Sequence, residues 1–279
     1  MVKKALALAA MLALASAVTA GEPVAPPAEQ ASPAPDVSAS EQATTEAVSL
    51  DWLKPFLLTN KSEYMLGEPV FLKLVVANWS PKHRFDIEGH LHPSNDMQIE
   101  VARVGELPKR YFGIGKKDVL LPQVSLPLPR GQMASLRWLL CHDPDKKNGF
   151  LFDQPGHYTI SSQARMTINK MTVTLTLPPP GGPPIEIVVT SPTLSEKPVL
   201  DQMMRPECAQ DLHRMRAGES TVKVWEDIAQ RYPQSVWAPY AKLMLLRRDA
   251  ESASSKPEAV MAQLEAIVKD YPDFPMRDD

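Results

Sequence analysis

The chain has 279 residues, a formal net charge of −3 and only two cysteines. This length exceeds what one small domain needs to bury a core, so one large or two modest domains are expected. No part of the chain concentrates the strong positive charge that nucleic-acid binding requires, so a nucleic-acid partner is not expected.

The first twenty residues predict export. Two lysines precede an apolar run over residues 5–15, and the small residues Val18 and Ala20 stand just before the expected cleavage site at Gly21. This is the pattern of a signal peptide. The run is shorter than the ~20 apolar residues that a membrane-spanning helix needs. We therefore expect a signal peptide over residues 1–20, no membrane insertion, and a periplasmic or secreted protein.

Residues 21–48 have the composition of a tether. The segment holds five prolines and five acidic residues, with no lysine, arginine or aromatic residue. Such a composition cannot bury enough apolar surface to offset chain entropy, so a disordered linker is expected here.

Residues 49–192 alternate apolar and polar side chains with period two, which predicts β-strands. Gly, Pro and Asn separate the runs, and the proline-rich stretch 178–184 predicts a loop. Several short strands within about 140 residues indicate an antiparallel β-sandwich. The clearest runs are 70–76, 97–101, 135–140, 158–162, 172–177 and 185–189.

Two stretches of this region resemble a known family. Residues 64–78, which begin Tyr-Met-Leu-Gly-Glu-Pro-Val, are similar to the opening strands of bacterial immunoglobulin-like domains, including those of the BsuPI proteinase-inhibitor family. Residues 152–160 resemble a late strand of such domains, where an aromatic hydroxyl ties a corner to nearby backbone. The resemblance implies an immunoglobulin-like sandwich, a fold that hosts many unrelated functions.

Residues 193–279 change to helical periodicity. Val222, Trp225 and Ile228 fall on one face, Ser220 is the expected N-cap, and Tyr232 followed by proline ends that helix. Further helices are expected over 235–250 and 256–270.

The helical region contains a short repeat. Residues 225–238 resemble the join between helices in bacterial tetratricopeptide-type repeats, and residues 264–274 repeat it 39 positions later, from Tyr232 to Tyr271. Only about one and a half units fit, fewer than such arrays need for stability. The helices must therefore gain apolar cover from the β-sandwich, from one another or from a second protein.

Three aromatic residues of this region have two interpretations. Trp225, Trp237 and Tyr240 are expected in the helical core, and the alternative is that they anchor a protein partner, since Trp and Tyr are enriched in binding hot spots. We name them as candidate partner-binding residues.

A second candidate site is a basic stretch with aromatic residues between 109 and 117. Lys109, Arg110, Tyr111, Lys116 and Lys117 predict either a solvated hairpin or a site for an anionic glycan.

Cys141 and Cys208 have two interpretations as well. They form a disulfide if their Cα atoms lie within the ~7 Å that bridging requires, or they are two buried free thiols.

Catalytic and metal-binding patterns are weak in this sequence. His90, His92, Asp96 and His142 lack the spacing of a known metal motif, and residues 143–149 depart from a calcium loop at its fifth and sixth positions. No nucleophile motif is present. We expect neither a catalytic residue nor a cofactor or metal.

The sequence favours a non-catalytic binding or scaffolding protein of the bacterial cell envelope, whose helices engage a protein partner. Two alternatives remain open. One is a proteinase inhibitor that acts through a sandwich loop, which the family resemblance suggests. The other is an envelope glycan-binding module that uses the basic stretch.

Overall fold

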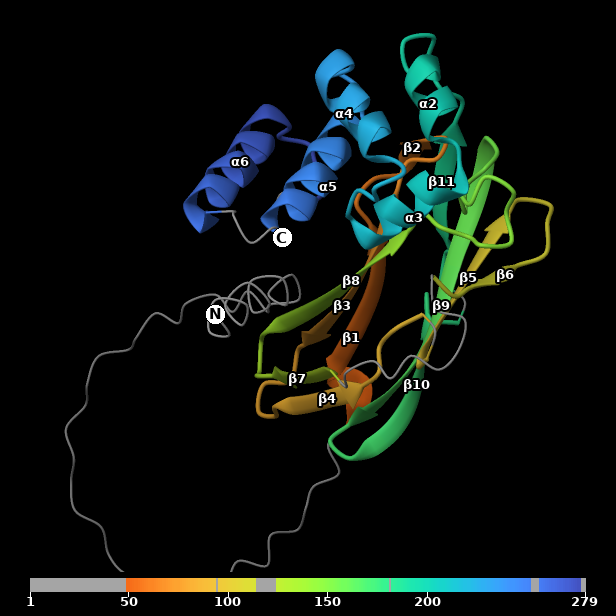
Figure 1. The fold of residues 1–279 in the computed structure, drawn as a ribbon. Coiled ribbons are helices and arrows are strands. Elements are labelled where there is room, and N and C mark those ends of the chain that lie inside the picture. Colours follow the sequence, from red (N-terminus) through yellow and green to blue (C-terminus); the bar gives the residue numbers. More distant parts are fainter. Residues whose placement is uncertain (1–48, 94, 114–123, 181, 252–255, 277–279) are drawn as a thin grey trace, which may run out of the picture.

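The computed structural model describes residues 49–93, 95–113, 124–180, 182–251 and 256–276 (Figure 1). The predicted signal peptide, the predicted linker and the candidates Lys116 and Lys117 lie outside these ranges. The described chain has a β part followed by a helical part, as expected. Among the described residues, no helix combines the length and the apolar character that crossing a bilayer requires.

The β part begins with a short 3-10 helix, η2 (Leu50–Trp52), and continues as strands. The strands are β1 (Leu53–Thr59), β2 (Glu63–Met65), β3 (Val70–Asn78), β4 (Phe85–Gly89), β5 (Met97–Arg103), β6 (Lys109–Tyr111), β7 (Val124–Leu128), β8 (Met133–Leu140), β9 (Gly156–Ile168), β10 (Met171–Leu177) and β11 (Ile185–Thr190).

These strands form two sheets. The smaller has the order β1-β3-β8, and the larger is built around β9, which pairs with β4, β5, β10 and β11. All of these pairs are antiparallel, but β2 joins the edge of the larger sheet parallel to β11. Alternate residues of both sheets, such as Leu72 and Leu74 on β3 and Ile160 on β9, meet in one apolar core.

Each strand predicted from alternation is present. The proline-rich stretch 178–184 is a connection, as expected from the lack of backbone donors at proline. Of the predicted solvated hairpin at 109–117, the structure describes residues 109–111 as strand β6. This strand pairs with β5, and the Tyr111 side chain is buried rather than solvated.

The helical part contains α2 (Lys197–Met203), α3 (Pro206–Arg214), α4 (Val222–Arg231), α5 (Ala238–Ala250) and α6 (Pro257–Asp270). Proline stands in the first turn of α2, α3, α5 and α6, where its missing N–H costs nothing. The predicted cap of α4 is corrected by one residue. Thr221 is the N-cap, and its hydroxyl donates to the buried carboxylate of Asp211.

The candidate partner anchors lie inside the molecule. Trp225 and Trp237 are 0% exposed and Tyr240 is 1% exposed, so a partner cannot reach these side chains in this conformation. The core interpretation is the one that the structure shows. Tyr240 packs in the helical core against Phe274, and its ring stacks on Phe71 of β3 with a centroid distance of 6.4 Å.

The helices gain their apolar cover from the end of the β part as well as from one another. Phe71, Cys141 and Phe150 belong to the same buried cluster as the helical side chains. Cys141 and Cys208 are both buried in this cluster and both free, so the disulfide alternative is not realised in the structure.

Two buried carboxylates fix the helices relative to one another. Glu196, which precedes α2, accepts hydrogen bonds from the Ser235 hydroxyl at 2.6 Å and the Val236 amide at 3.0 Å, in the turn before α5. Asp211 of α3 accepts from the indole N–H of Trp225 at 2.8 Å. Buried polar groups with satisfied partners hold a single arrangement of the elements that contribute them.

At Gly149 the β part lies close against the start of α3. This glycine has φ of +76°, and a Cβ built there lies 2.7 Å from the Cα of Pro206. Gly131 also has a positive φ, +69°, but nothing lies within 4 Å of its Cβ position. Comparing substitutions at these two glycines therefore separates the cost of backbone strain from the cost of steric contact.

We expect Gly149→Ala to lower the free energy of unfolding by about 3 kcal/mol, from strain of about 1–2 kcal/mol and overpacking of similar size. Gly131→Ala, the matched control, should cost only the strain. Chemical denaturation of both variants measures the difference. Equal losses would show that α3 does not lie against this turn.

Candidate functional site

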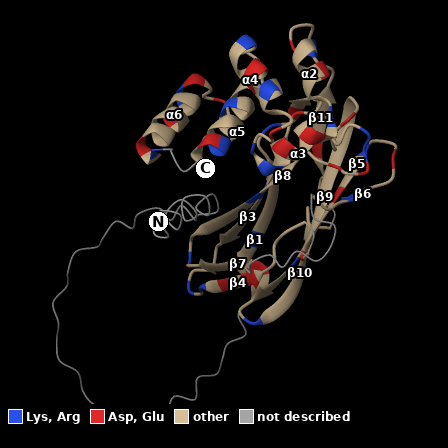
Figure 2. Cartoon of the chain, in the orientation of Figure 1, with Lys and Arg blue, Asp and Glu red and all other residues tan. Residues whose placement is uncertain are grey.

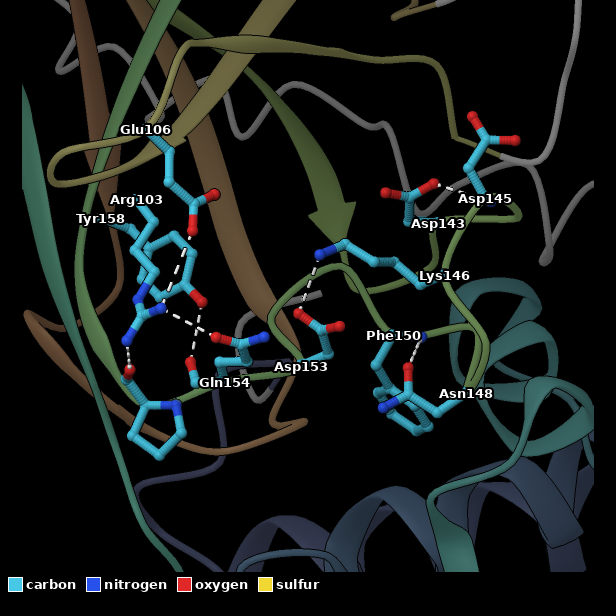
Figure 3. A network of polar contacts seen from close by, with 11 residues as sticks. Arg103, Glu106, Asp143, Asp145, Lys146, Asn148, Phe150, Asp153, Gln154 and Tyr158 are labelled. Carbon is cyan, nitrogen blue, oxygen red and sulfur yellow. Dashed lines mark hydrogen bonds and ion pairs between the residues drawn. The ribbon is translucent and has the colours of Figure 1, made fainter.

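The candidate site is a cleft on the β part between the β5–β6 connection and the loop that joins β8 to β9. Its volume is about 430 Å³, and residues from both segments line it, including Arg103, Lys109, Arg110, Tyr111, Asp143 and Lys146. Basic, acidic and aromatic side chains therefore face one space (Figure 3). The cleft contains the described part of the basic stretch that the sequence indicates.

The β5–β6 connection is a tight turn that is fixed to the neighbouring strand. The Glu106 amide donates to the Arg103 carbonyl at 2.8 Å, and the Val104 amide donates to the His157 carbonyl at 2.8 Å. β6 then pairs with β5, with Val101 opposite Lys109. Lys109 and Arg110 are exposed on this short edge strand.

The opposite wall is a closed polar turn over residues 142–150. The Asp143 amide donates to the Gly149 carbonyl at 2.9 Å, and the Asp145 amide donates to the Asp143 carboxylate at 3.0 Å. His142 contacts the Gly149 carbonyl through Nδ1 at 2.9 Å. The Asp143 carboxylate thus stabilises the turn itself.

A network of polar contacts fixes the floor of the cleft (Figure 3). The guanidinium of Arg103 donates to the Gln154 side chain at 2.8 Å and to the Pro155 carbonyl at 2.9 Å. The Tyr158 hydroxyl donates to the Gln154 carbonyl at 2.7 Å. This contact confirms the expectation that an aromatic hydroxyl ties the corner before this strand to nearby backbone.

Lys146 reaches across the turn to Asp153. Its ammonium nitrogen lies 2.9 Å from the carboxylate, and both side chains are largely buried. Within the described residues, no ion pair is recorded for Lys109 or Arg110, and the Arg110 guanidinium lies 4.8 Å from the ring centre of Phe112. The cleft therefore has a paired floor and a rim whose two cations are available to a ligand.

Tyr111 departs from its predicted role as a surface contact. It is buried, and its hydroxyl donates to the Leu139 carbonyl at 3.0 Å. Burial raises its pKa well above the ordinary tyrosine value. The same hydroxyl lies 3.3 Å from Nδ1 of His213 on α3, so Tyr111 connects the cleft to the helical part.

His213 is held neutral at this junction. Burial lowers its pKa to about 4, and the neighbouring positive charges of His142, His92 and Arg214 add to the effect. The rings of His142 and His213 lie 6.3 Å apart, and burial lowers the pKa of His142 too.

The candidate metal ligands do not form a cluster in the part of the chain that the structure describes. No group of three or more His, Cys, Asp or Glu side chains there is arranged to hold a metal ion. Asp96 instead accepts a hydrogen bond from the His90 amide at 2.9 Å, which closes a local turn.

Sequence reasoning missed Arg103, Tyr158 and Lys146 as members of the site. The residues stand 12 to 55 positions apart in the chain, and only the pairing of β5 with β9 brings Arg103 beside Tyr158. The sequence did indicate Tyr158, as a tyrosine near the start of a late strand. That position predicts a corner in the fold but not which side chains lie beside it.

Comparison with known proteins gives no family. No family model and no curated protein matches the chain. Among solved structures, a β-glucosidase of Erythrobacter marinus aligns at 10% identity and a TM-score of 0.26, over 50% of this chain and 15% of that one. A β-glucosidase of Listeria innocua aligns at 14% identity and a TM-score of 0.26, over 51% and 17%. The sporulation control protein Spo0M of Bacillus subtilis aligns at 13% identity and a TM-score of 0.25, over 54% of each chain. At such TM-scores these matches carry no argument about fold or function.

The lowered pKa of His213 predicts acid sensitivity. The unfolded chain takes up a proton at this histidine near pH 6.5, whereas the folded chain does so only near pH 4. The unfolded state therefore binds more protons between these values, so stability falls as the pH falls through this window.

We expect His213→Gln to lose less stability than the wild type between pH 7 and pH 5. Urea denaturation at both pH values measures this difference, and comparing the two changes cancels the loss of the Tyr111 contact. The same pH dependence in both proteins would show that His213 is not buried in its neutral form.

Proposed function

We propose that this chain is an exported, non-catalytic binding protein of the bacterial cell envelope, whose helical part engages a protein partner. In this proposal the β part is an immunoglobulin-like sandwich that orients the helices, and α4 to α6 are a short tetratricopeptide-like array. The signal-peptide pattern of residues 1–20 supports export, to the periplasm or the medium.

The two copies of the Tyr-Pro motif support the repeat interpretation. Tyr232 and Tyr271 are the C-caps of α4 and α6, with similar backbone angles of −123° and 53°, and −128° and 74°. In each case the backbone amide of the cap residue donates to the carbonyl oxygen of the residue four positions earlier. The Tyr271 hydroxyl also donates to the Pro233 carbonyl at 2.9 Å, so the second copy contacts the first.

The observation that carries the proposal is the open side of α6. Of its fourteen residues only Ile267 is buried, whereas α5 buries seven. A groove of about 280 Å³ lies between α5 and α6, with Leu245, Leu246, Ala266 and Ile267 among its apolar lining. Lys242, Asp249, Gln263 and Asp270 add a polar rim. An amphipathic helical segment of a partner fits an apolar groove with a charged rim.

The proposed binding surface does not include Trp225, Trp237 and Tyr240, because these side chains are buried. They hold α4 and α5 in place, and the groove-lining side chains of α6 are the ones that a partner can reach.

We expect Ala266→Arg to abolish capture of a discrete partner, because the new side chain fills the groove and places a charge over its apolar lining. Glu265→Gln changes the net charge by the same amount on an exposed residue that does not line the groove, so it is the matched control. Cross-linking of residues 21–279 in the envelope of the producing cell, followed by mass spectrometry, compares the two. Equal capture by both variants, or none by the wild type, would sink the proposal.

The cleft of Figure 3 favours a second candidate function, binding of an anionic glycan of the envelope. Lys109 and Arg110 are exposed at its rim, and Arg110 lies over Phe112, an aromatic ring that belongs to the same lining. A sugar with carboxylate or phosphate groups finds both cations and an aromatic face there.

For this candidate we expect retention of the protein on purified cell-wall polysaccharide, lost when Lys109 and Arg110 are both changed to Ala. Lys223 and Arg231 of α4, changed together to Ala, give a charge-matched control away from the cleft. Retention that survives the change at 109 and 110 would exclude the cleft as the glycan site.

A further inference from the structure

The surface at the end of the β part away from the helices remains outside the functions proposed above. There the chain enters the fold at η2, and the loop from β3 to β4 and the turn from β7 to β8 lie beside it (Figure 1). The Trp79 amide donates to the Trp52 carbonyl at 2.9 Å, and the Asn78 amide donates to the Gln132 carbonyl at 2.9 Å. These contacts place the three segments side by side.

Large apolar side chains are exposed on this end. Trp52 is 43% exposed, Trp79 is 60% exposed and Met133 is 66% exposed. The outward face of β1 continues the surface, because its alternation turns Phe56 and Leu58 outward while Leu53 and Leu57 enter the core. Exposed apolar groups that gather in one region mark an interaction surface.

Basic side chains surround the two tryptophans. Lys82 and Arg84 lie on the same loop as Trp79, Arg130 lies on the neighbouring turn, and Lys54 follows Trp52 on β1. All four are exposed. Within the described residues, Lys54 and Lys82 form no recorded ion pair, whereas Arg84 pairs with Asp86 at 2.8 Å. Figure 2 shows lysine and arginine at the loop ends near β4, β7 and β10, and acidic residues on β4. We call Trp52, Trp79 and Met133 with Lys54, Lys82 and Arg130 the aromatic–basic end.

This end is rigid because a buried asparagine holds its loops. Asn78 is fully buried, and its amide nitrogen donates to the carbonyls of His83 at 2.9 Å, Leu128 at 3.0 Å and Pro129 at 3.0 Å. Its side-chain oxygen accepts from the Ser80 amide at 2.8 Å. The loop that presents Trp79 and Lys82 is thus fixed at both of its ends, so their exposure belongs to a defined surface.

We propose that the aromatic–basic end docks on the surface of an anionic lipid membrane. Tryptophan is the residue that best fits the boundary between acyl chains and headgroups, and lysine or arginine around it attracts anionic headgroups. On the segments that form this end, the exposed cations Lys54, Lys82, Arg84 and Arg130 outnumber the exposed carboxylates Asp51, Asp86 and Glu88, so the local charge is complementary to an anionic surface.

The lysines favour a lipid surface over a protein partner. Tryptophan, methionine and arginine suit both, but the centre of a protein–protein interface is depleted in lysine, whereas here Lys54 and Lys82 stand on the same segments as the tryptophans. A glycan site would instead hold the aromatic rings within a concave surface. The clefts described above lie elsewhere, and Met133 and Leu58 offer a sugar no hydrogen bond.

Sedimentation with vesicles tests the proposal. Residues 21–279, which keep every described residue and omit only the apolar N-terminal run, are mixed with vesicles of equal parts phosphatidylcholine and phosphatidylglycerol, or of phosphatidylcholine alone. We expect binding to the anionic vesicles only, weakening as salt is added.

Two variants should weaken this binding. Lys82→Glu replaces an attraction by a repulsion and should weaken binding about tenfold or more, since each cation near an anionic surface contributes about fivefold. Trp79→Ala should weaken it to a similar degree. Lys223→Glu on α4 and Leu194→Ala, both exposed on the helical side, are the matched controls and should bind as the wild type does.

A spectroscopic measurement locates the contact. The chain has five tryptophans, and in the structure Trp225 and Trp237 are buried, Trp138 is partly buried, and Trp52 and Trp79 are exposed. Vesicles with brominated acyl chains should quench the exposed pair. Trp79→Phe keeps an aromatic side chain, so it should retain binding while losing part of this quenching.

Several results would overturn the proposal. These are no binding to anionic vesicles at low salt, or equal binding by Lys82→Glu and Lys223→Glu. Self-association that depends on Trp79 without vesicle binding would assign the surface to a second copy of the chain. Retention on insoluble peptidoglycan without vesicle binding would assign it to a glycan. Ala266→Arg should bind vesicles normally, so this test and that of the α5–α6 groove fail independently.

Discussion

The architecture depends on one shared apolar core at the junction of the sheets and the helices. The five helices of the described residues are short and do not bury all their apolar faces against one another. Phe71, Cys141 and Phe150 complete that burial from the end of the β part, and Gly149 lets α3 approach closely enough for the contact. Removing this contact would expose helical side chains that pack nowhere else, so the two parts form one structural unit.

Polar groups fix the orientation within this apolar junction. Glu196 and Asp211 hold the helices to one another, and the Tyr111 hydroxyl meets His213 between β6 and α3. Each of these buried polar groups would lose its hydrogen-bond partner if the elements shifted. A buried polar group without a partner costs free energy, so other arrangements of the elements are disfavoured. The cleft beside β6 and the groove beside α6 are therefore held in fixed positions relative to each other, at two separate places on one rigid body.

The opposite end of the β part is stabilised by a single buried side chain. There the buried asparagine Asn78 satisfies the loops internally, so their outer side chains are left free to be apolar and basic. The molecule thus has surfaces of different chemistry at its two ends: a groove between helices at one, and a platform of tryptophan and lysine at the other. The two proposals assign a protein partner to the first surface and a lipid membrane to the second.

The sequence by itself predicted the strands with strict alternation and three of the helices, because periodicity and proline positions are local properties. Two of these helices were expected over 235–250 and 256–270, and the structure places them at Ala238–Ala250 and Pro257–Asp270. The sequence did not reveal β1, in which Phe56 and Leu58 are apolar but exposed, so that alternation is hidden. Only the tertiary structure decided that Trp225, Trp237 and Tyr240 are buried, that Tyr111 is an internal residue, and that Trp52 and Trp79 share one surface. These outcomes depend on which distant segments lie side by side, and that is set by strand pairing and by the shared core rather than by any local pattern.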